Sequence, residues 1–561
     1  MAQINPLGRS LAAQAIADHR ELRSPVHLVP QADVDLYSYI EARGFHFPRE
    51  LVSRYLIALR TKPFALFTGI SGTGKTKLAL LTAEYFARLP GTQAHRREQP
   101  QDGDSDFYLP IDRVTLRSGT LTPSREQLDY FNVPAGVTET FTATITNVLG
   151  AHGDITFRAT NLVSGGTKHL TIQVPSSVRR AFEQTGVSER DYLRFEIVEE
   201  FKRYRVSLFR PETELVEVPA DDRYAFVSVR PRWDDHTPLL GSWDTELERY
   251  VRTPVLELML RAAREEADAK AAGVAPAPYF VILDEMNIAR IEHYFSDFLS
   301  ALESRRISED GSVRQEPLHL HAADAARIAW VDHMGIEYEI PERLPIPTNV
   351  MFTGTLNLDD TTWGLSPKVV DRASTIGFGA VDYAGFLVGA AAEQVSDPIE
   401  LPADVTRGGD FLGSFQLAES ADSREMATHL QPFVQLNELL VAHDQHYGYR
   451  VLNDVALYVR NVRDLIDDAP ETLHAAVDVC VLQKVLPKFF TWDRDRAGLL
   501  ASLLTLCVDG DVAEPGRDID LAALLTRVKV DYADRGWHAD GREAWLPRSG
   551  GRLVRMLHAM G

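Results

Sequence analysis

Cysteine is almost absent from this chain of 561 residues, which contains only Cys480 and Cys507. Both lie in apolar segments with a helical pattern, so neither a disulfide framework nor a zinc cluster is expected. Long apolar runs are also missing, since no stretch approaches the roughly 18 consecutive apolar residues of a membrane-spanning helix. The stretch before Val26 lacks the apolar core of a signal peptide. These absences predict a protein of the reducing cytoplasm that does not enter a membrane.

Positive charge is in deficit, because 59 Lys and Arg stand against 80 Asp and Glu, for a formal net charge of −21. Such a chain is not a general binder of polyanions. The charge is uneven, however: residues 113–210 contain 13 basic and 10 acidic residues, a net of +3, which leaves about −24 on the rest. If nucleic acid is bound, this middle segment is the expected place.

The composition, 45% hydrophobic and 25% charged, is that of a folded globular protein. At about 150 residues per domain, the length predicts two to four domains. Strands alternate with helices on both sides of a β-rich middle segment, which indicates an α/β fold with a parallel sheet. The predicted parts are a short helical extension (1–45), a first core part (46–112), an inserted β-rich domain (113–221), a second core part (222–385) and a C-terminal helical lid (386–561).

Hydrophobic periodicity predicts the elements that carry the chemistry. We expect strands at 64–68, 279–284 and 349–356, each followed by polar or glycine-rich residues. We expect a polar loop at 90–106 and helices at 246–272 and 289–306. The insert is predicted to be an antiparallel β unit or barrel with a helix at 177–184.

A glycine-rich loop follows the first predicted core strand. Residues 69–76 fit the P-loop pattern G-x-x-x-x-G-K-[ST], with a strand before them and a helix after them. Glycines allow backbone N–H groups to surround phosphate oxygens, and the helix N-terminus adds partial positive charge. We expect Lys75 to reach the β- and γ-phosphates and Thr76 to bind Mg²⁺; the alternative is a chance glycine loop. The residues predicted to contact nucleotide here are Gly69, Ile70, Ser71, Gly72, Thr73, Gly74, Lys75, Thr76 and Lys77.

A second apolar strand ends in two acids, Asp284 and Glu285. Asp284 is expected to bind Mg²⁺ directly or through water, and Glu285 to orient and activate the attacking water. The alternative is that both acids cap the following helix. The acidic strand together with the glycine-rich loop is far more specific than either motif alone.

Two further residues complete the predicted site. Asn357 follows a third strand, expected to lie between the other two, from which its side chain can reach the γ-phosphate; the alternative is a turn-forming asparagine. Arg372 ends a short helix and is a candidate arginine finger for the nucleotide of a neighbouring subunit. Its alternative is an intrachain ion pair with Asp371 or another acid.

Several stretches together resemble AAA+ ATPases of the McrB branch, which is related to MoxR and dynein-like modules. The resemblance covers about 46–90 and 225–561 and includes Met286, Asn287 and Arg290, similar to the MNxxR signature of McrB proteins. The stretches that carry it are FTGISGTGKTKLA, VSVRPRWDDHTPLLGSWD, PYFVILDEMNIARIEHYFSDFLSALE, FTGTLNLDDTTWGLSPKVVDRA, HYGYRVLNDVALYV, LQKVLPKF and LPRSGGRLVRML.

The resemblance implies an AAA+ fold, a homo-oligomeric ring, expected to be a hexamer, and Mg²⁺-dependent hydrolysis of ATP or GTP at the subunit interfaces. It implies that Asn357 is a sensor-1 residue, Arg372 an arginine finger and Arg450, in the lid, a sensor-2-type contact to phosphate. It also implies a separate McrC-like nuclease subunit and translocation of double-stranded DNA. Asn287 and Arg290 would couple the site to the neighbouring subunit or to that nuclease.

The chain departs from the family in two places. The stretch DRASTIGF, which begins at Asp371, contains only Arg372, where some McrB proteins carry several arginines. Only about 45 residues precede the core, too few for the DNA-reading domain of the best-known member, and a long insert stands inside the core instead. What the protein recognises therefore cannot be transferred from the family.

The insert faintly resembles small β-barrel DNA binders of the AbrB or B3 kind. Its aromatic residues Tyr192, Phe201 and Tyr204 are expected to stack on bases or to pack. The alternative is the solvated surface of a docking module. Glu200 and Lys202 have the E-x-K spacing of a nuclease core, but no Pro-Asp step precedes them, so no nuclease site is expected. The residues predicted to contact DNA phosphates are Arg179, Arg180, Lys202, Arg203, Arg205 and Arg210.

Two functions from different classes remain open. The first is the motor subunit of a McrBC-like restriction or phage-defence complex that acts on DNA. The second is a MoxR-like chaperone that remodels a protein partner, which its insert would bind. A nucleotide sensor that does not hydrolyse is disfavoured, because Lys75, Asp284 and Glu285 are all present.

Overall fold

The structure is a computed structural model, and most of the chain beyond residue 33 can be described. The predicted N-terminal extension lies largely outside the described residues, as does the predicted boundary at 385. The described residues are 34–88, 94–97, 100, 102–103, 105–111, 113–124, 126–146, 154–164, 167–185, 187, 191–210, 213–216, 220–246, 249–308, 313–322, 328–357, 366–379, 397–408, 412, 416–441, 443–489, 497–510, 523–525, 528–530, 537–539, 542–543 and 545–560.

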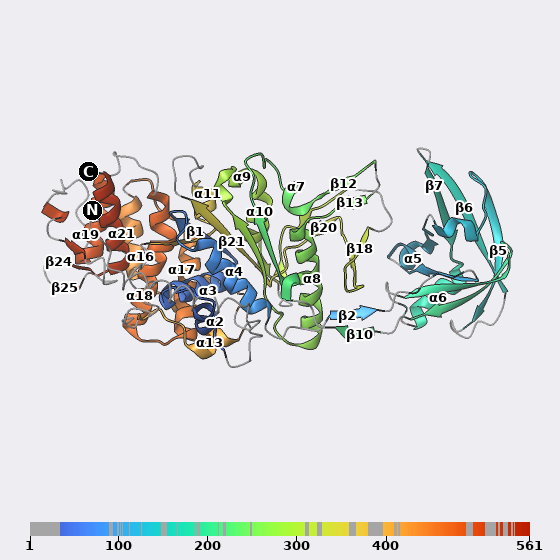
Figure 1. Cartoon of the computed structure of the whole chain (residues 1–561), viewed down its shortest axis with the longest axis horizontal. Coiled ribbons are helices and arrows are strands. Elements are labelled where there is room, and N and C mark those ends of the chain that lie inside the picture. Colours follow the sequence, from blue (N-terminus) through green and yellow to red (C-terminus); the bar gives the residue numbers. More distant parts are fainter. Residues whose placement is uncertain are drawn as a thin grey trace, which may run out of the picture.

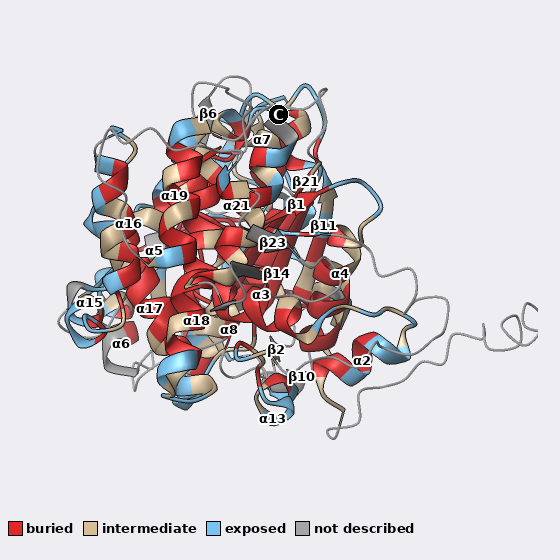
Figure 2. Cartoon of the chain, turned by 90° about the vertical axis from the view of Figure 1, so that its left-hand side faces the viewer, coloured by how far each residue is buried: buried red, intermediate tan, exposed pale blue. Residues whose placement is uncertain are grey.

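A five-stranded parallel sheet forms the centre of the molecule, and its strands run through the most buried region (Figures 1 and 2). The strand order is β11–β14–β21–β1–β22, so β21 lies between β14 and β1, as predicted. The parallel α/β class is thereby confirmed. The strands are β1 (Phe64–Gly69), β11 (Tyr224–Ser228), β14 (Tyr279–Asp284), β21 (Val350–Asn357) and β22 (Ser374–Gly377).

Helices cover both faces of this sheet. Successive residues of a strand point to opposite sides, so alternate residues of β1 pack against different helices. Ala65 and Phe67 belong to a hydrophobic cluster with α2, α3 and α4, whereas Phe64 and Leu66 belong to a second cluster with α8, α9 and α10. The helices around the sheet are α2 (Leu36–Ala42), α3 (Arg49–Thr61), α4 (Lys75–Ala87), α7 (Thr237–Leu240), α8 (Pro254–Ala272), α9 (Ile291–Tyr294), α10 (Ser296–Glu303) and α11 (Pro367–Val370).

Two helix predictions need correction. The helix predicted from 246 begins at Pro254, where the Thr253 side chain accepts a hydrogen bond from the Leu256 amide and caps it. The residues before it form β13 (Arg249–Val251), which pairs with β12 (Ser242–Asp244). The helix predicted at 289–306 is two short helices, α9 and α10, because Phe295 between them leaves the helical conformation.

Short hairpins join α10 to β21. They are β15 (Arg306–Ile307) with β16 (Val313–Arg314), β17 (Leu318–His319) with β20 (Arg343–Leu344), and β18 (Ala329–Val331) with β19 (Glu337–Glu339).

The insert lies apart from the core, at the end of a two-stranded ribbon (Figure 1). The ribbon pairs β2 (Ala94–Arg97) with β10 (Thr213–Val216), so part of the predicted polar loop at 90–106 is a strand. The sheet of the insert also takes in β3 (Asp106–Pro110), which corrects the predicted start at 113. The insert has a hydrophobic core of its own, built from aromatic residues of several strands.

The seven strands of the insert form a mixed sheet in the order β3–β8–β9–β5–β6–β7–β4. Strands β5 and β9 run parallel, so the sheet is not wholly antiparallel, and β3 and β4 are edges, so the described strands close no barrel. The predicted helix at 177–184 is confirmed as α6 (Ser176–Thr185). The other elements are β4 (Thr120–Leu121), β5 (Thr138–Thr146), β6 (Asp154–Ser164), β7 (Thr167–Gln173), β8 (Tyr192–Glu199), β9 (Arg203–Phe209), α5 (Arg113–Ser118) and the short helix η1 (Glu126–Tyr130).

The C-terminal part is mainly helical and shares one hydrophobic cluster with α2, α3 and α4. No helix in the described residues is long and apolar enough to cross a bilayer. The elements are α13 (Ala403–Arg407), α15 (Ser420–Glu425), α16 (Gln431–Val441), α17 (Tyr449–Leu465), α18 (Pro470–Cys480), a turn of π-helix η4 (Val481–Val485), η5 (Leu486–Phe489), α19 (Ala497–Asp509), α21 (Pro547–Met560), and the strands β23 (Val528–Val530), β24 (Trp537–Ala539) and β25 (Arg542–Glu543).

Arg548 fastens the last helix to the rest of the molecule. Its guanidinium donates to both carboxylate oxygens of Asp397 at 2.6 Å and to Glu50 at 3.2 Å. Its backbone amide donates to Asp478 at 2.8 Å. Asp397 and Asp478 are buried and have no other ion-pair partner among the described residues, so Arg548 compensates their charge, whereas Glu50 is also paired with Arg54.

We expect Arg548→Met to lower the free energy of unfolding of the C-terminal helices by about 3–5 kcal/mol, because it leaves buried acids without their partner. Native-state hydrogen exchange of α18 and α21 measures this change. Arg463, whose partners Glu425 and Asp464 lie at the surface, provides the control. Arg463→Met should change exchange little. An equal effect of the two substitutions would contradict this view of Arg548.

Candidate functional site

The glycine-rich loop joins β1 to α4 at the carboxyl edge of the sheet. Gly72 and Gly74 have φ angles of 83° and 90°, a region that residues with a Cβ rarely adopt. A Cβ on Gly74 would also lie 2.9 Å from the Phe47 ring, so Phe47 packs directly against the loop. The loop therefore presents its backbone at the N-terminus of a helix of 13 residues.

Lys75 is the first residue of α4, and its side chain is buried. Its ammonium donates to the carbonyl oxygens of Gly69 at 2.9 Å and Ile70 at 2.7 Å. Burial lowers the pKa of Lys75, while Asp284 and Glu285 oppose this shift. The ammonium is thus held against the backbone of the loop and near the two acids.

Asp284 ends β14 and receives two hydroxyl groups on one oxygen. Thr76 Oγ1 and Thr355 Oγ1 both donate to Asp284 Oδ1 at 2.7 Å. Thr355 in turn accepts from the amide of Glu285 at 2.9 Å. Residues of α4, β14 and β21 therefore meet at one carboxylate oxygen, because parallel strands bring their carboxyl ends to the same edge.

Glu285 has a φ angle of 55°, which is uncommon for a residue with a side chain. Its carboxylate accepts a hydrogen bond from Asn357 Nδ2 at 3.1 Å. It makes no side-chain capping bond to the following turn. The predicted alternative, in which Glu285 caps the next helix, is therefore not what the structure has.

Asn287 fixes the end of β21. Its Nδ2 donates to the carbonyl of Asn357 at 2.8 Å, and its Oδ1 accepts from the Asn357 amide at 3.4 Å. The turn that carries Asn287 packs closely on β21, since a Cβ on Gly354 would lie 2.2 Å from Met286 Sδ. Asn287 thus holds the backbone from which the Asn357 side chain reaches Glu285. Arg290 follows this turn as the residue before α9.

Arg372 and Arg450 come together on one acid, although they are 78 positions apart in the sequence. Both form ion pairs with Glu303, at the end of α10. Asp371, the acid named first in the alternative for Arg372, lies 3.1 Å from Lys488. Within the described residues, no hydrogen bond or ion pair joins either arginine to residues 69–76. The intrachain ion pair given as the alternative for Arg372, with Asp371 or another acid, is thus present, and the acid is Glu303.

Four of the six basic residues predicted to contact DNA phosphates are paired with acids. Lys202 lies 3.3 Å from Glu199, Arg203 2.8 Å from Asp154, Arg205 2.7 Å from Glu196 and Arg210 3.7 Å from Asp191. These pairs reduce the positive charge that the hairpin of β8 and β9 offers to a phosphate backbone.

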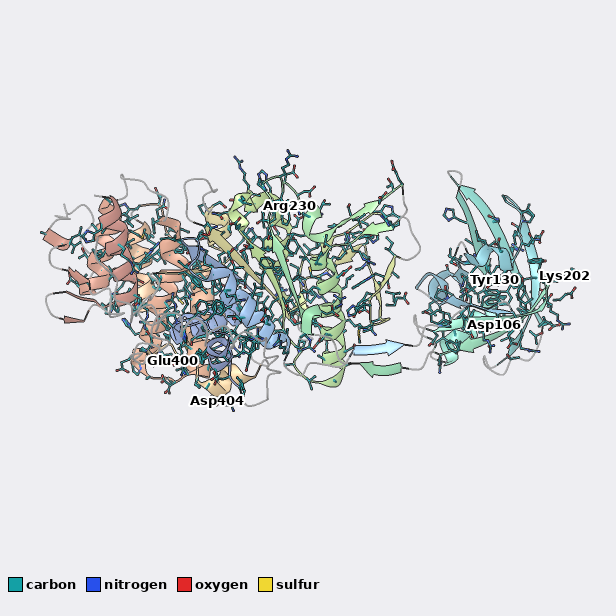
Figure 3. All side chains as sticks on the ribbon, viewed as in Figure 1. Asp106, Tyr130, Lys202, Arg230, Glu400 and Asp404 are labelled. Carbon is teal, nitrogen blue, oxygen red and sulfur yellow. The ribbon has the colours of Figure 1, made fainter. Side chains whose placement is uncertain are left out.

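The other insert residues differ in position. Arg180 is exposed, whereas Arg179 is half-buried and lies against Gly119. Tyr204 is buried in the insert core and donates to the carbonyl of Tyr130, so it packs. Lys202 lies at the outer end of the insert, far from the core sheet, while Tyr130 lies inside (Figure 3).

Three residues of this region were not predicted from the sequence. Thr355 lies two residues before Asn357 on the same strand, so alternation along β21 could have indicated it. Phe47 contacts Gly74 from 27 positions upstream. Phe45, two residues before Phe47, lies under the Lys77 ammonium, which is 5.1 Å from the centre of its ring. Glu303 gave no signal, because an acid near the end of a helix is usually solvated.

The comparison with known families concerns the C-terminal part alone. Residues 405–560 match a family described as a domain of unknown function, DUF8727. A search of curated proteins returned no match. The matched region carries Arg450, Lys484 and Lys488, whereas the glycine-rich loop and the acids of β14 lie outside it.

Proposed function

We propose that this protein is a Mg²⁺-dependent nucleoside triphosphatase of the AAA+ class, acting on ATP or GTP. One observation carries the proposal: Thr76, Asp284, Glu285 and Asn357 lie in a single hydrogen-bonded chain at the carboxyl edge of the sheet, beside the glycine-rich loop. The position of β21 between β1 and β14 supports the AAA+ assignment, since it brings Asn357 between the loop and the acids.

The glycine-rich loop would bind the triphosphate. Its backbone N–H groups and the N-terminus of α4 suit phosphate oxygens. Lys75 is already desolvated beside the loop, so its ammonium can transfer hydrogen bonds from the carbonyls of Gly69 and Ile70 to the β- and γ-phosphates. A desolvated ammonium interacts strongly with phosphate, because water does not screen it.

Thr76 and Asp284 fit a magnesium site. A hydroxyl and a carboxylate oxygen lie side by side there, and proteins usually bind Mg²⁺ through one or two such oxygens together with phosphates and water. The ion would neutralise charge on the β- and γ-phosphates. Thr355 orients the Asp284 carboxylate by donating to the same oxygen as Thr76.

Glu285 would serve as the base that orients the attacking water. Its carboxylate points toward Asn357, which holds it through one oxygen and leaves the other to accept from water. Asn357 is then placed to contact the γ-phosphate as a sensor residue. Asn287 keeps this asparagine in register and links it to the turn that precedes Arg290.

We propose that the chain acts in a homo-oligomeric ring, expected to be a hexamer, in which Arg372 contacts the nucleotide of a neighbour. Arg450 lies beside Arg372 on Glu303, so the two arginines occupy one face of the subunit. In such a ring, the neighbour's phosphates would compete with Glu303 for both guanidinium groups. Planar guanidinium groups are well suited to such anions.

The ring would be the motor of a McrBC-like restriction complex in the cytoplasm, with double-stranded DNA as its track and a separate McrC-like nuclease as its partner. A MoxR-like chaperone that remodels a protein is the second candidate. The ion pairs that Lys202, Arg203 and Arg205 make with acids support this second candidate, because they reduce the positive charge that the insert offers to DNA.

Turnover of ATP and of GTP, with and without duplex DNA, tests these proposals. Arg97 and Thr213 face each other at the top of the ribbon, so a two-residue Asn-Gly turn can replace residues 98–212 without opening it. We expect the shortened chain to keep basal hydrolysis and to lose DNA binding and stimulation. DNA binding that survives the deletion would show that the insert is not the reader, and a full-length chain that never binds DNA would favour the chaperone.

A further inference from the structure

The turn that carries Arg372 is held on both sides by lysines of the C-terminal part. Lys488 Nζ lies 3.1 Å from the carboxylate of Asp371, directly before Arg372. Lys484 Nζ donates to the carbonyl of Ala373, directly after it, at 2.8 Å. The two lysines are four residues apart, and both contact the turn of the core at residues 371–373.

Both lysines are themselves anchored. Lys484 lies 3.7 Å from Asp454, which also accepts from Lys62 at 2.8 Å. The Lys488 ammonium lies 3.5 Å from the centre of the Tyr447 ring, and the Tyr447 hydroxyl donates to the carbonyl of Lys484 at 3.0 Å. Asp454 of α17 therefore fixes the position of the Lys484 ammonium, and Tyr447, two residues before α17, fixes that of the Lys488 ammonium.

Lys484 is an unusual residue for its surroundings. It is buried, and burial lowers its pKa to about 8 against the opposing attraction of Asp454. An apolar side chain would fill this space without the cost of desolvating a charge. Lys484 also lies in the turn of π-helix η4, a geometry that is rare and is found frequently at functional sites. What the lysine provides is a donor that reaches the backbone beside Arg372.

We propose that Lys484 and Lys488 are positioning residues that fix the Arg372 turn to the C-terminal helices, so that these helices set the direction in which Arg372 reaches a neighbouring subunit. The proposal rests on the proposed function, in which Arg372 acts on the neighbour's nucleotide. It adds that the arginine moves with the part of the chain that carries Arg450. The state of that part then controls how the finger is presented.

The test compares Lys488→Met and Lys484→Met with Lys62→Met in the full chain. Lys62 provides a matched control, because it pairs with the same acid as Lys484 but does not contact the Arg372 turn. We expect both test variants to lower kcat for NTP hydrolysis by about tenfold or more at unchanged KM, since misplacing a catalytic group by about 1 Å can cost 100-fold. Lys62→Met should keep kcat even where it lowers the melting temperature.

A second readout does not depend on activity. Amide hydrogen exchange at residues 371–374 should rise in Lys488→Met and Lys484→Met and stay unchanged in Lys62→Met. Lys488 lies nearer the surface than Lys484, so its variant keeps the test usable if Lys484→Met does not fold. Lys488→Arg should restore both exchange and kcat, because it keeps a donor opposite Asp371. Unchanged exchange and unchanged kcat in Lys488→Met would overturn the proposal.

Arg372→Ala separates this proposal from the one on which it rests. If Arg372→Ala lowers kcat, adding Lys488→Met to it should cause no further loss, because both changes remove the same contact to the neighbour. A further loss would overturn the positioning role. If Arg372→Ala leaves kcat unchanged, the arginine finger of the proposed function fails, whatever the lysine variants do to exchange.

Discussion

Glu285→Gln is expected to lower kcat for NTP hydrolysis by about 1000-fold, within the range of about 10²–10⁴ that a positioned general base contributes. Glutamine retains an oxygen that can accept from Asn357 Nδ2, so the local geometry should persist. It cannot take up a proton from water. Thr76 and Asp284 are untouched, so nucleotide affinity, measured by titration with a fluorescent analogue in the presence of Mg²⁺, should stay close to that of the parent chain.

Glu292 provides the matched control for this substitution. It lies on α9, seven residues farther along the chain, and Glu292→Gln removes the same charge without touching the hydrogen-bonded chain of the site. We expect it to leave kcat unchanged. If Glu285→Gln keeps the turnover of the parent chain, Glu285 is not the general base.

Lys75→Ala is expected to weaken nucleotide binding by at least about 100-fold, a change of about 2.7 kcal/mol in binding free energy. Charge-assisted hydrogen bonds to phosphate are among the strong ones, and the ammonium of Lys75 is already desolvated beside the loop. Isothermal titration with a non-hydrolysable triphosphate measures this loss independently of catalysis. The melting temperature should fall slightly, because the carbonyl of Gly69, buried at the end of β1, loses the ammonium as a donor, whereas Ile70 is exposed and its carbonyl can bond to water.

Lys77 is the control for the second substitution. It is the next lysine of α4, but its ammonium lies over the Phe45 ring. Lys77→Ala should weaken binding much less than Lys75→Ala. Equal losses would mean that general positive charge near the loop, and not the specific position of Lys75, accounts for binding.

The residues of the central site could be predicted because their signal is local. The glycines, Lys75 and Thr76 are adjacent in sequence, and Asp284 and Glu285 directly end an apolar strand. The place of β21 between β14 and β1 could also be predicted, because only a strand between these two brings Asn357 close to both the glycine-rich loop and the acids of β14. The structure brings these side chains together, while their roles in hydrolysis remain predictions.

Contacts between distant segments gave no such signal. The strand Ala94–Arg97 lacks apolar alternation and becomes ordered through pairing with residues 213–216, more than 100 positions later. Glu303 is identified as a functional candidate only when Arg372 and Arg450 are seen beside it. The start of α8 is a different case, because Thr253 before Pro254 is a recognisable helix N-terminus that periodicity alone overlooked.

The ribbon that carries the insert has a mechanical consequence. Its first strand, β2, follows the helix that begins at Lys75, and its second strand, β10, leads back to β11, whose last residue, Ser228, is paired with Asp284. Both attachments of the insert therefore lead to the candidate site, one to the helix that begins with Lys75 and the other to the strand paired with Asp284. A force on the insert would act on both elements together.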